Sequence, residues 1–230
     1  MSMLTADEAS AVLLSLKVAT VATLASLPVA IAVGWLLARR RFPGRLLVDA
    51  LVHLPLVLPP VVTGYALLAL LGRRGLIGAW LHDALGITFA FRWTGAALAC
   101  AVMGFPLMVR AIRLSIEGVD RRLENAASTL GASRWRVFTG ITLPLAWPGI
   151  VAGAVLGFAK AVGEFGATIT FVSSIPGETR TLSSAIYGLL QVPGAESRVW
   201  LLCAVSVAIS FIAMLAAEAL LQRGRTDPPT

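Results

Sequence analysis

Residues 124–144 read ENAASTLGASRWRVFTGITLP, a segment that lies between two long apolar runs of the chain. It combines two arginines with large apolar side chains, namely Leu130, Trp135, Val137, Phe138 and Ile141. A loop that is only solvated has no need of so many apolar side chains, because water disfavours the surface that they expose. We therefore interpret this segment as a docking surface for a partner protein.

The same segment has the residue pattern of two short helices joined by a turn. Ala126 and Ala127 have small side chains, which let a partner approach the helix backbone closely. Gly131 is placed to adopt the left-handed conformation that ends a helix. Ser133 is an acceptable N-cap for a second helix, and Pro144 is expected to stop that helix.

The composition of the whole chain indicates a membrane protein. Of its 230 residues, 57% are hydrophobic and 13% are charged, and the mean hydropathy is +0.84. These values lie outside the range of soluble globular domains. The net charge of +7 does not indicate nucleic-acid binding, because the arginines cluster at the ends of apolar runs, where they set membrane topology. We expect an all-α membrane protein that binds no nucleic acid.

Five segments are long enough to cross the bilayer, since about 20 apolar residues span its hydrocarbon core. They cover roughly 11–38, 46–71, 94–116, 147–172 and 199–221. The loops after the first and third segments and the tail are rich in arginine, and such loops stay in the cytoplasm. We therefore expect a periplasmic N-terminus and a cytoplasmic C-terminus. The first ten residues carry no basic side chain, so we expect the first apolar run to be retained.

Several chemistries find no support in the residues. Lys17 and Lys160 are the only lysines, and neither belongs to the G-x-x-x-x-G-K-[ST] loop that binds nucleotide phosphates. Cys100 and Cys203 both lie in apolar runs, where cysteine behaves as a small hydrophobic residue. We expect no catalytic site, no metal and no cofactor in this chain.

The segment 124–144 resembles the EAA loop of bacterial ABC importer permeases, whose pattern is Glu-Ala-Ala, three residues, Gly, nine residues, Ile-x-Leu-Pro. The matching positions are Glu124, Ala127, Gly131, Ile141, Leu143 and Pro144, whereas Asn125 departs at the first alanine. The resemblance implies a type I ABC importer permease domain over about 10–221, with a coupling loop over 120–144. It also implies a separate ATPase subunit, which binds ATP and Mg²⁺ and receives the loop in a groove. Glu124 is then expected to be a polar anchor to that partner.

Residues 163–187 are similar to the corresponding segment of molybdate permeases. The shared elements are Gly-Glu-Phe-Gly-Ala-Thr at 163–168, Ile-Pro-Gly-x-Thr at 175–179 and Ala-Ile-Tyr at 185–187. Sulfate permeases share a related Glu-Phe-Gly and Ile-Pro-Gly framework. The resemblance extends over about 11–221 and implies an oxyanion importer of molybdate, with tungstate or sulfate/thiosulfate as alternatives.

A translocation path is indicated by breaks and charges within the apolar segments. Pro59 and Pro60 predict a bend, which a membrane tolerates where helices or a water-lined cavity satisfy the freed carbonyls. Lys160 and Glu164 lie four residues apart and can neutralise each other, with contact of Lys160 to the anion as the alternative. The candidate residues for the path or for helix pairing are Lys160, Glu164, Phe165, Thr168, Pro59 and Pro60.

The external loop before the last apolar segment is a candidate docking site for a periplasmic oxyanion-binding protein. It has a mixed-charge surface formed by Glu178, Arg180, Glu196 and Arg198. An ordinary solvated loop is the alternative. Five spans are too few to enclose a path, so we expect two copies of this chain with two ATPase subunits beneath. A secondary transporter working alone is disfavoured, because five spans cannot be divided into matched halves, and a membrane anchor would not need interrupted spans.

Overall fold

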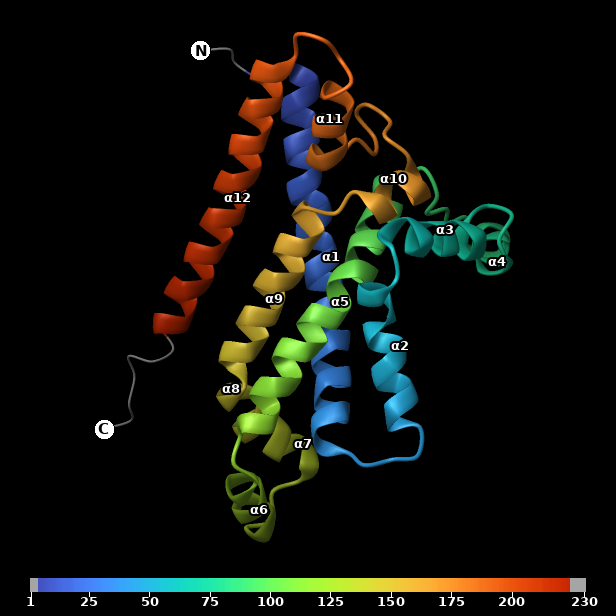
Figure 1. The fold of residues 1–230 in the computed structure, drawn as a ribbon. Helices are drawn as coiled ribbons and strands as arrows, with labels where there is room; N and C mark the ends of the chain where they lie inside the picture. Colours follow the sequence, from blue (N-terminus) through green and yellow to red (C-terminus); the bar gives the residue numbers. More distant parts are fainter. Residues whose placement is uncertain (1–3, 224–230) are drawn as a thin grey trace.

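The computed structural model describes residues 4–223, a range that contains helices and turns and no strand (Figure 1). The helices in chain order are α1 (Ala6–Arg39), α2 (Arg45–Val57), α3 (Pro60–Leu71), α4 (Leu76–Leu85), α5 (Trp93–Gly118), α6 (Arg121–Thr129), α7 (Arg134–Val137), a π-helix (Phe138–Thr142), α8 (Leu143–Leu145), α9 (Trp147–Val162), α10 (Gly166–Val172), α11 (Leu182–Leu189) and α12 (Glu196–Arg223). The expectation of an all-α protein is confirmed.

Three helices are long and apolar enough to cross a membrane by themselves: α1, α5 and the part of α12 from Glu196 to Ala216. They contain the predicted segments 11–38 and 94–116 and most of 199–221. The number of spans rises to five if each of two bent helix pairs is counted as one span. The first turn of α1 is fixed by a capping box between Thr5 and Glu8, which satisfies two backbone N–H groups.

The predicted segment 46–71 is not one straight helix. Helix α2 ends at Val57, the axis turns by 114°, and α3 begins at Pro60. Two consecutive prolines cause the break, because Pro60 has no N–H to donate and its ring keeps Pro59 out of the helical conformation. As a result α3 and α4 extend sideways from the bundle (Figure 1).

The predicted segment 147–172 is also interrupted. Helix α9 ends at Val162, and α10 starts at Gly166 after a break of three residues. The Glu164 side chain accepts a hydrogen bond of 2.9 Å from the Ala167 N–H, so a side chain replaces a backbone acceptor in the first turn of α10. A further bend of 68° separates α9 from the helical segment Arg134–Leu145.

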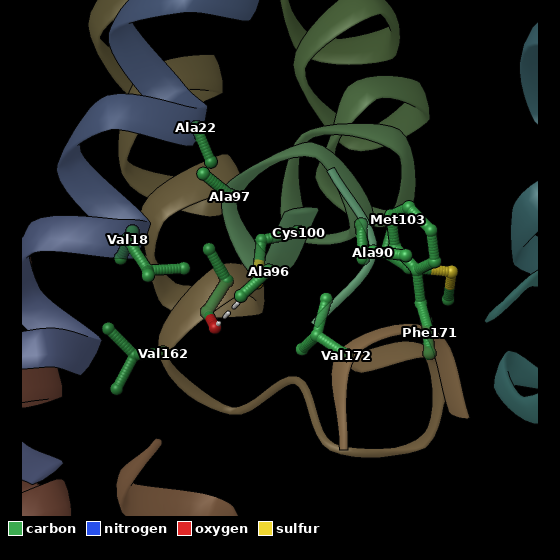
Figure 2. Packing of buried hydrophobic residues seen from close by; sticks show 14 residues of the cluster. Val18, Ala22, Ala90, Ala96, Ala97, Cys100, Met103, Val162, Phe171 and Val172 are labelled. Carbon is green, nitrogen blue, oxygen red and sulfur yellow. Dashed lines mark hydrogen bonds between the residues drawn. The ribbon is translucent and has the colours of Figure 1, made fainter. Parts of the chain in front are cut away.

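The core lies where α1, α5 and α9 pack together, and it is built largely from small side chains. Ala19 of α1 and both Ala96 and Ala99 of α5 are completely buried. Figure 2 shows this packing around Cys100, whose thiol contacts the Ala161 carbonyl oxygen at 3.5 Å. Small residues allow helices to approach closely where lipid provides no hydrophobic driving force. By contrast, α12 lies along the outside, with 6% of its most apolar stretch buried.

Candidate functional site

The first half of the predicted docking segment forms α6, which ends as the sequence indicates. Gly131 has φ +86°, the left-handed conformation that suits glycine. The N–H of Ala132 donates to the Ala127 carbonyl at 3.0 Å, and the Gly131 N–H donates to the Ser128 carbonyl at 3.1 Å. These two bonds make a Schellman motif, which satisfies carbonyls at the helix end. The predicted turn at Gly131 is confirmed.

The second half of the segment is one helical path from Arg134 to Leu145 that contains the π-helix. Its predicted N-cap is confirmed, since the Ser133 hydroxyl accepts a hydrogen bond from the Arg136 N–H at 3.4 Å. The predicted end at Pro144 is confirmed to within one residue. The helical segment ends at Leu145, and a bend of 68° separates it from α9.

Glu124 connects three elements of the same chain. Both of its carboxylate oxygens lie 3.2 Å from Nε of Arg39, at the end of α1. The Thr142 hydroxyl, in the π-helix, donates to Oε1 of Glu124 at 2.6 Å. Arg39 also donates to the Val119 carbonyl at 2.9 Å. The Arg39 and Glu124 side chains are 9% and 16% exposed, so Glu124 binds within the chain, and its role as an anchor to a partner stays a prediction.

The register of the EAA resemblance needs a correction at its first position. In that pattern the glycine stands six residues after the glutamate, and Gly131 stands seven residues after Glu124. Counted back from Gly131, the glutamate position falls on Asn125, which is exposed. Leu130 and Trp135 are also exposed, at 88% and 71%. The outward face of the loop is therefore formed by Asn125, Leu130 and Trp135, whereas Glu124 faces the bundle.

The two helix breaks meet in space, although they lie about 100 residues apart in the chain. A Cβ atom on Gly166 would lie 2.8 Å from Cβ of Pro60, and one on Gly64 would lie 2.5 Å from the Ala167 carbonyl oxygen. The start of α3 thus crosses the start of α10 at backbone contact distance, and only glycine fits at these two positions. This junction brings Pro60 together with the break that contains Glu164 and Phe165.

The predicted pairing of Lys160 with Glu164 is present. Nζ of Lys160 lies 2.5 Å from Oε2 of Glu164. The carboxylate is 1% exposed and the lysine side chain 29% exposed. Glu164 lies in the break after α9 and not on the same helix as Lys160. Both oxygens of Glu164 therefore serve the fold, one with Lys160 and the other with the first turn of α10.

The other residues proposed for the path differ in their exposure. Thr168 is buried, and its hydroxyl donates to the Phe165 carbonyl at 2.9 Å. The Phe165 ring packs on Tyr187 of α11 at a centroid distance of 4.9 Å. Pro59 is exposed. The structure therefore uses Thr168 and Phe165 for packing within this chain and leaves Pro59 on its surface.

Replacement of Lys160 by methionine tests the buried pair. We expect a lower thermal midpoint for the detergent-solubilised chain, because the buried Glu164 carboxylate would lose its cationic partner. Loss of one partner of a buried pair costs about 3–5 kcal/mol, and the partial exposure of Lys160 places this change at the lower end. The double variant K160M/E164Q should be more stable than K160M. A midpoint that is lower in the double variant than in K160M would contradict the pairing.

The four charges proposed as a docking surface are only partly brought together. Arg180 and Arg198 line one cavity of about 270 Å³, which neither Glu178 nor Glu196 lines. Nε of Arg198 donates to Oε1 of Glu8 at 2.7 Å, and this bond joins the first turns of α12 and α1. Arg198 therefore has a structural partner that the sequence reasoning missed.

Arg39 and Thr142 are the functional candidates that sequence reasoning missed near the loop. Arg39 was counted only as a topology residue, and it lies 85 positions from Glu124. The sequence contains no pattern that pairs these two residues.

Within residues 4–223, no three His, Cys, Asp or Glu side chains group closely enough to hold a metal ion. Cys100 and Cys203 are free thiols.

The fold and the loop agree with the match of this chain to a protein family. Residues 30–226 match the family of binding-protein-dependent transport system inner membrane components. The chain belongs to this family. It is therefore a multi-pass inner-membrane permease subunit of an importer that works with a binding protein, and it is not an enzyme.

Curated relatives cover nearly the whole chain. The molybdenum transport system permease protein ModB of Escherichia coli strain K12 is 62% identical over 96% of this chain and 97% of its own length. The ModB protein of Haemophilus influenzae is 56% identical over 94% of both chains. The sulfate transport system permease protein CysT of Escherichia coli strain K12 is 38% identical over 77% of this chain and 65% of its own length.

Solved structures share the fold at low sequence identity. A chain of the inward-facing MetNI methionine ABC transporter has a TM-score of 0.72 at 17% identity and covers 93% of this chain and 94% of its own. A chain of a bacterial alginate ABC transporter, solved with a pentasaccharide-bound periplasmic protein, has a TM-score of 0.77 at 18% identity and covers 98% of this chain and 82% of its own. The fold is that of type I ABC importer permeases.

Proposed function

We propose that this chain is the permease subunit of an ATP-driven importer that carries molybdate across the inner membrane. The observation that carries the proposal is the likeness to two ModB proteins at 62% and 56% identity over almost the entire chain. It is supported by the position of the Gly163–Thr168 segment, which covers the three-residue break after α9 and the first turn of α10.

ATP hydrolysis takes place in a separate ATPase subunit, which also holds Mg²⁺ and docks on the loop 120–144. The exposed side chains Leu130 and Trp135 support this, since they offer apolar anchors to a groove. The candidate coupling residues are Glu124, Ala126, Ala127, Leu130, Gly131, Ile141, Leu143 and Pro144. Glu124 acts inside the chain, where its bond to Arg39 transmits displacement of α6 to α1.

The permease works as two copies of this chain, which face each other across the path. The exposed apolar surface of α2 and α3 supports this arrangement, because it includes Leu51, Val57 and Tyr65 at 59%, 80% and 65% exposure. The N-terminus is periplasmic and the C-terminus cytoplasmic, as the arginine-rich loops indicate. A purified complex whose measured mass contains one permease chain would contradict the two-copy assembly.

The oxyanion arrives on a periplasmic binding protein that docks at the end of the bundle where α11 and α12 begin. The candidate contacts are Glu178, Arg180, Glu196 and Arg198. Arg180 is the best supported, because it lines a cavity and has no ion-pair partner within residues 4–223. Crosslinking from this position to the binding protein would test the contact, and its failure in an active complex would contradict it.

Uptake of labelled molybdate into vesicles that contain the whole importer tests the cargo. We expect unlabelled molybdate and tungstate to compete strongly, because the two tetrahedral dianions have nearly the same size. Sulfate, which is smaller, should compete at least about tenfold less well, a difference of about 1.4 kcal/mol. If sulfate competes as well as molybdate does, the result would favour a sulfate permease. This is the alternative function, and the 38% identity to CysT supports it.

A further inference from the structure

A strongly basic cavity lies where α1 ends and α2 begins. Its volume is about 490 Å³, and its lining residues are Ala38, Arg39, Arg40, Arg41, Arg45, Glu117 and Arg121. A second cavity of about 310 Å³ shares Arg39, Arg40 and Arg121 with the first and extends to Arg134. We call the first of these the α1–α2 basic cavity. It contains five arginines and one carboxylate.

The carboxylate does not neutralise the arginines around it. Glu117 Oε1 accepts a hydrogen bond from Nε of Arg113 at 2.9 Å, and Arg113 does not line the α1–α2 basic cavity. Arg39 is occupied by Glu124. Within residues 4–223, no carboxylate pairs with Arg40, Arg41 or Arg45. The cavity therefore gathers like charges that repel one another, and a bound anion would relieve that repulsion.

The chemistry of the lining points to a phosphate group. Arginine presents several N–H donors in a planar fork, which matches the oxygens of phosphate. The cavity gathers arginines from the last turn of α1, from the loop that follows and from the first residue of α2. Donors that approach from several directions suit a tetrahedral anion better than they suit a planar anion.

The apolar neighbours of the cavity point to a lipid as the source of that phosphate. Leu46 and Leu47, in the first turn of α2 beside Arg45, are 83% and 64% exposed. Trp35 lies one turn before Arg39 and stacks with Arg40 at 5.5 Å. Tryptophan and arginine at the end of a span are typical of the headgroup level of a membrane. A headgroup in the cavity would place its acyl chains over Leu46 and Leu47.

We propose that the α1–α2 basic cavity binds the phosphate of an anionic phospholipid. A basic pocket between membrane helices attracts such headgroups, and each arginine contributes about 1 kcal/mol of attraction. The site adjoins the coupling loop, because Arg39 lines the cavity and also binds Glu124. The proposal does not depend on which oxyanion is transported.

Native mass spectrometry of the permease purified with its ATPase tests the site, with phosphatidylglycerol and phosphatidylcholine as probes. We expect the wild type to retain phosphatidylglycerol, and R41Q/R45Q to bind it about 25-fold more weakly. The matched control R73Q/R74Q removes the same charge from the loop between α3 and α4 and should bind as the wild type does. Equal binding by the wild type and R41Q/R45Q would overturn the proposal.

Two further arms keep the result decisive. If R41Q/R45Q does not reach the membrane, Arg45→Gln alone is expected to bind about fivefold more weakly, and unchanged binding would overturn the site. Millimolar inorganic phosphate should leave phosphatidylglycerol bound if the occupant is a lipid. Displacement of the lipid by phosphate, together with phosphate binding alone, would assign the cavity to a soluble anion and overturn the lipid.

Discussion

Glu124→Gln should insert normally into the membrane and lower oxyanion uptake by at least about tenfold. Loss of the carboxylate charge leaves the guanidinium of Arg39, which is 9% exposed, with neutral acceptors such as the Val119 carbonyl and without a counter-charge. An unpaired buried charge is strongly unfavourable, so Arg39 will move and α6 will lose its tie to α1. Uptake and the ATPase rate of the complex should be measured together, because uncoupling lowers uptake more than it lowers ATP hydrolysis.

The Arg39→Gln variant separates the internal tie from a contact with the ATPase. If Glu124 acts through Arg39, the Arg39→Gln variant has the same defect, and the double variant is no worse than either single one. If Glu124 instead binds the ATPase, Arg39→Gln should transport normally. Asp83→Asn serves as control, because this exposed α4 carboxylate has no ion-pair partner within residues 4–223. Additive losses in the double variant would contradict the tie.

Gly64→Ala is expected to abolish most uptake and to reduce the amount of folded permease. The added Cβ would lie 2.5 Å from the Ala167 carbonyl oxygen and 2.9 Å from Cα of the same residue. Both are backbone atoms, so α3 and α10 must separate where the two helix breaks cross. Overpacking of this kind costs typically about 1–3 kcal/mol.

Membrane content, thermal midpoint and uptake should be measured for Gly64→Ala and for a control substitution at a glycine that has room for a Cβ. Gly118, the last residue of α5, is suitable, because a Cβ there meets no atom within 4 Å. Gly118→Ala should match the wild type in all three measurements. A Gly64→Ala chain with wild-type midpoint and uptake would show that the contact between α3 and α10 is not required.

The helices and the turn of the segment 124–144 could be predicted in most of their parts, because their determinants are local. A glycine with positive φ ends α6, and a serine cap begins the next helix within a few residues. Such features depend on the backbone near them, so a sequence pattern is sufficient. The end of that helix beside Pro144 has a local cause too, because the segment stops at Leu145, one residue after the proline.

The helix breaks could be predicted only in part. Pro59 and Pro60 indicated a bend, but its angle of 114° and the contact of α3 with α10 are visible only in the structure. The break after α9 was missed, since its glycines stand in an apolar run that reads as one span. At this break the Glu164 side chain accepts a hydrogen bond from the Ala167 N–H, a local bond that the sequence analysis did not anticipate.

By itself, the sequence determined that the chain is an all-α membrane protein and predicted the ion pair between Lys160 and Glu164. Composition and contacts within four residues are enough for these conclusions. Only the tertiary structure decided that Glu124 binds Arg39, that Gly64 crosses Ala167, and that the arginines after α1 converge on one cavity. These contacts join segments far apart in the chain, and helix packing alone brings them within reach.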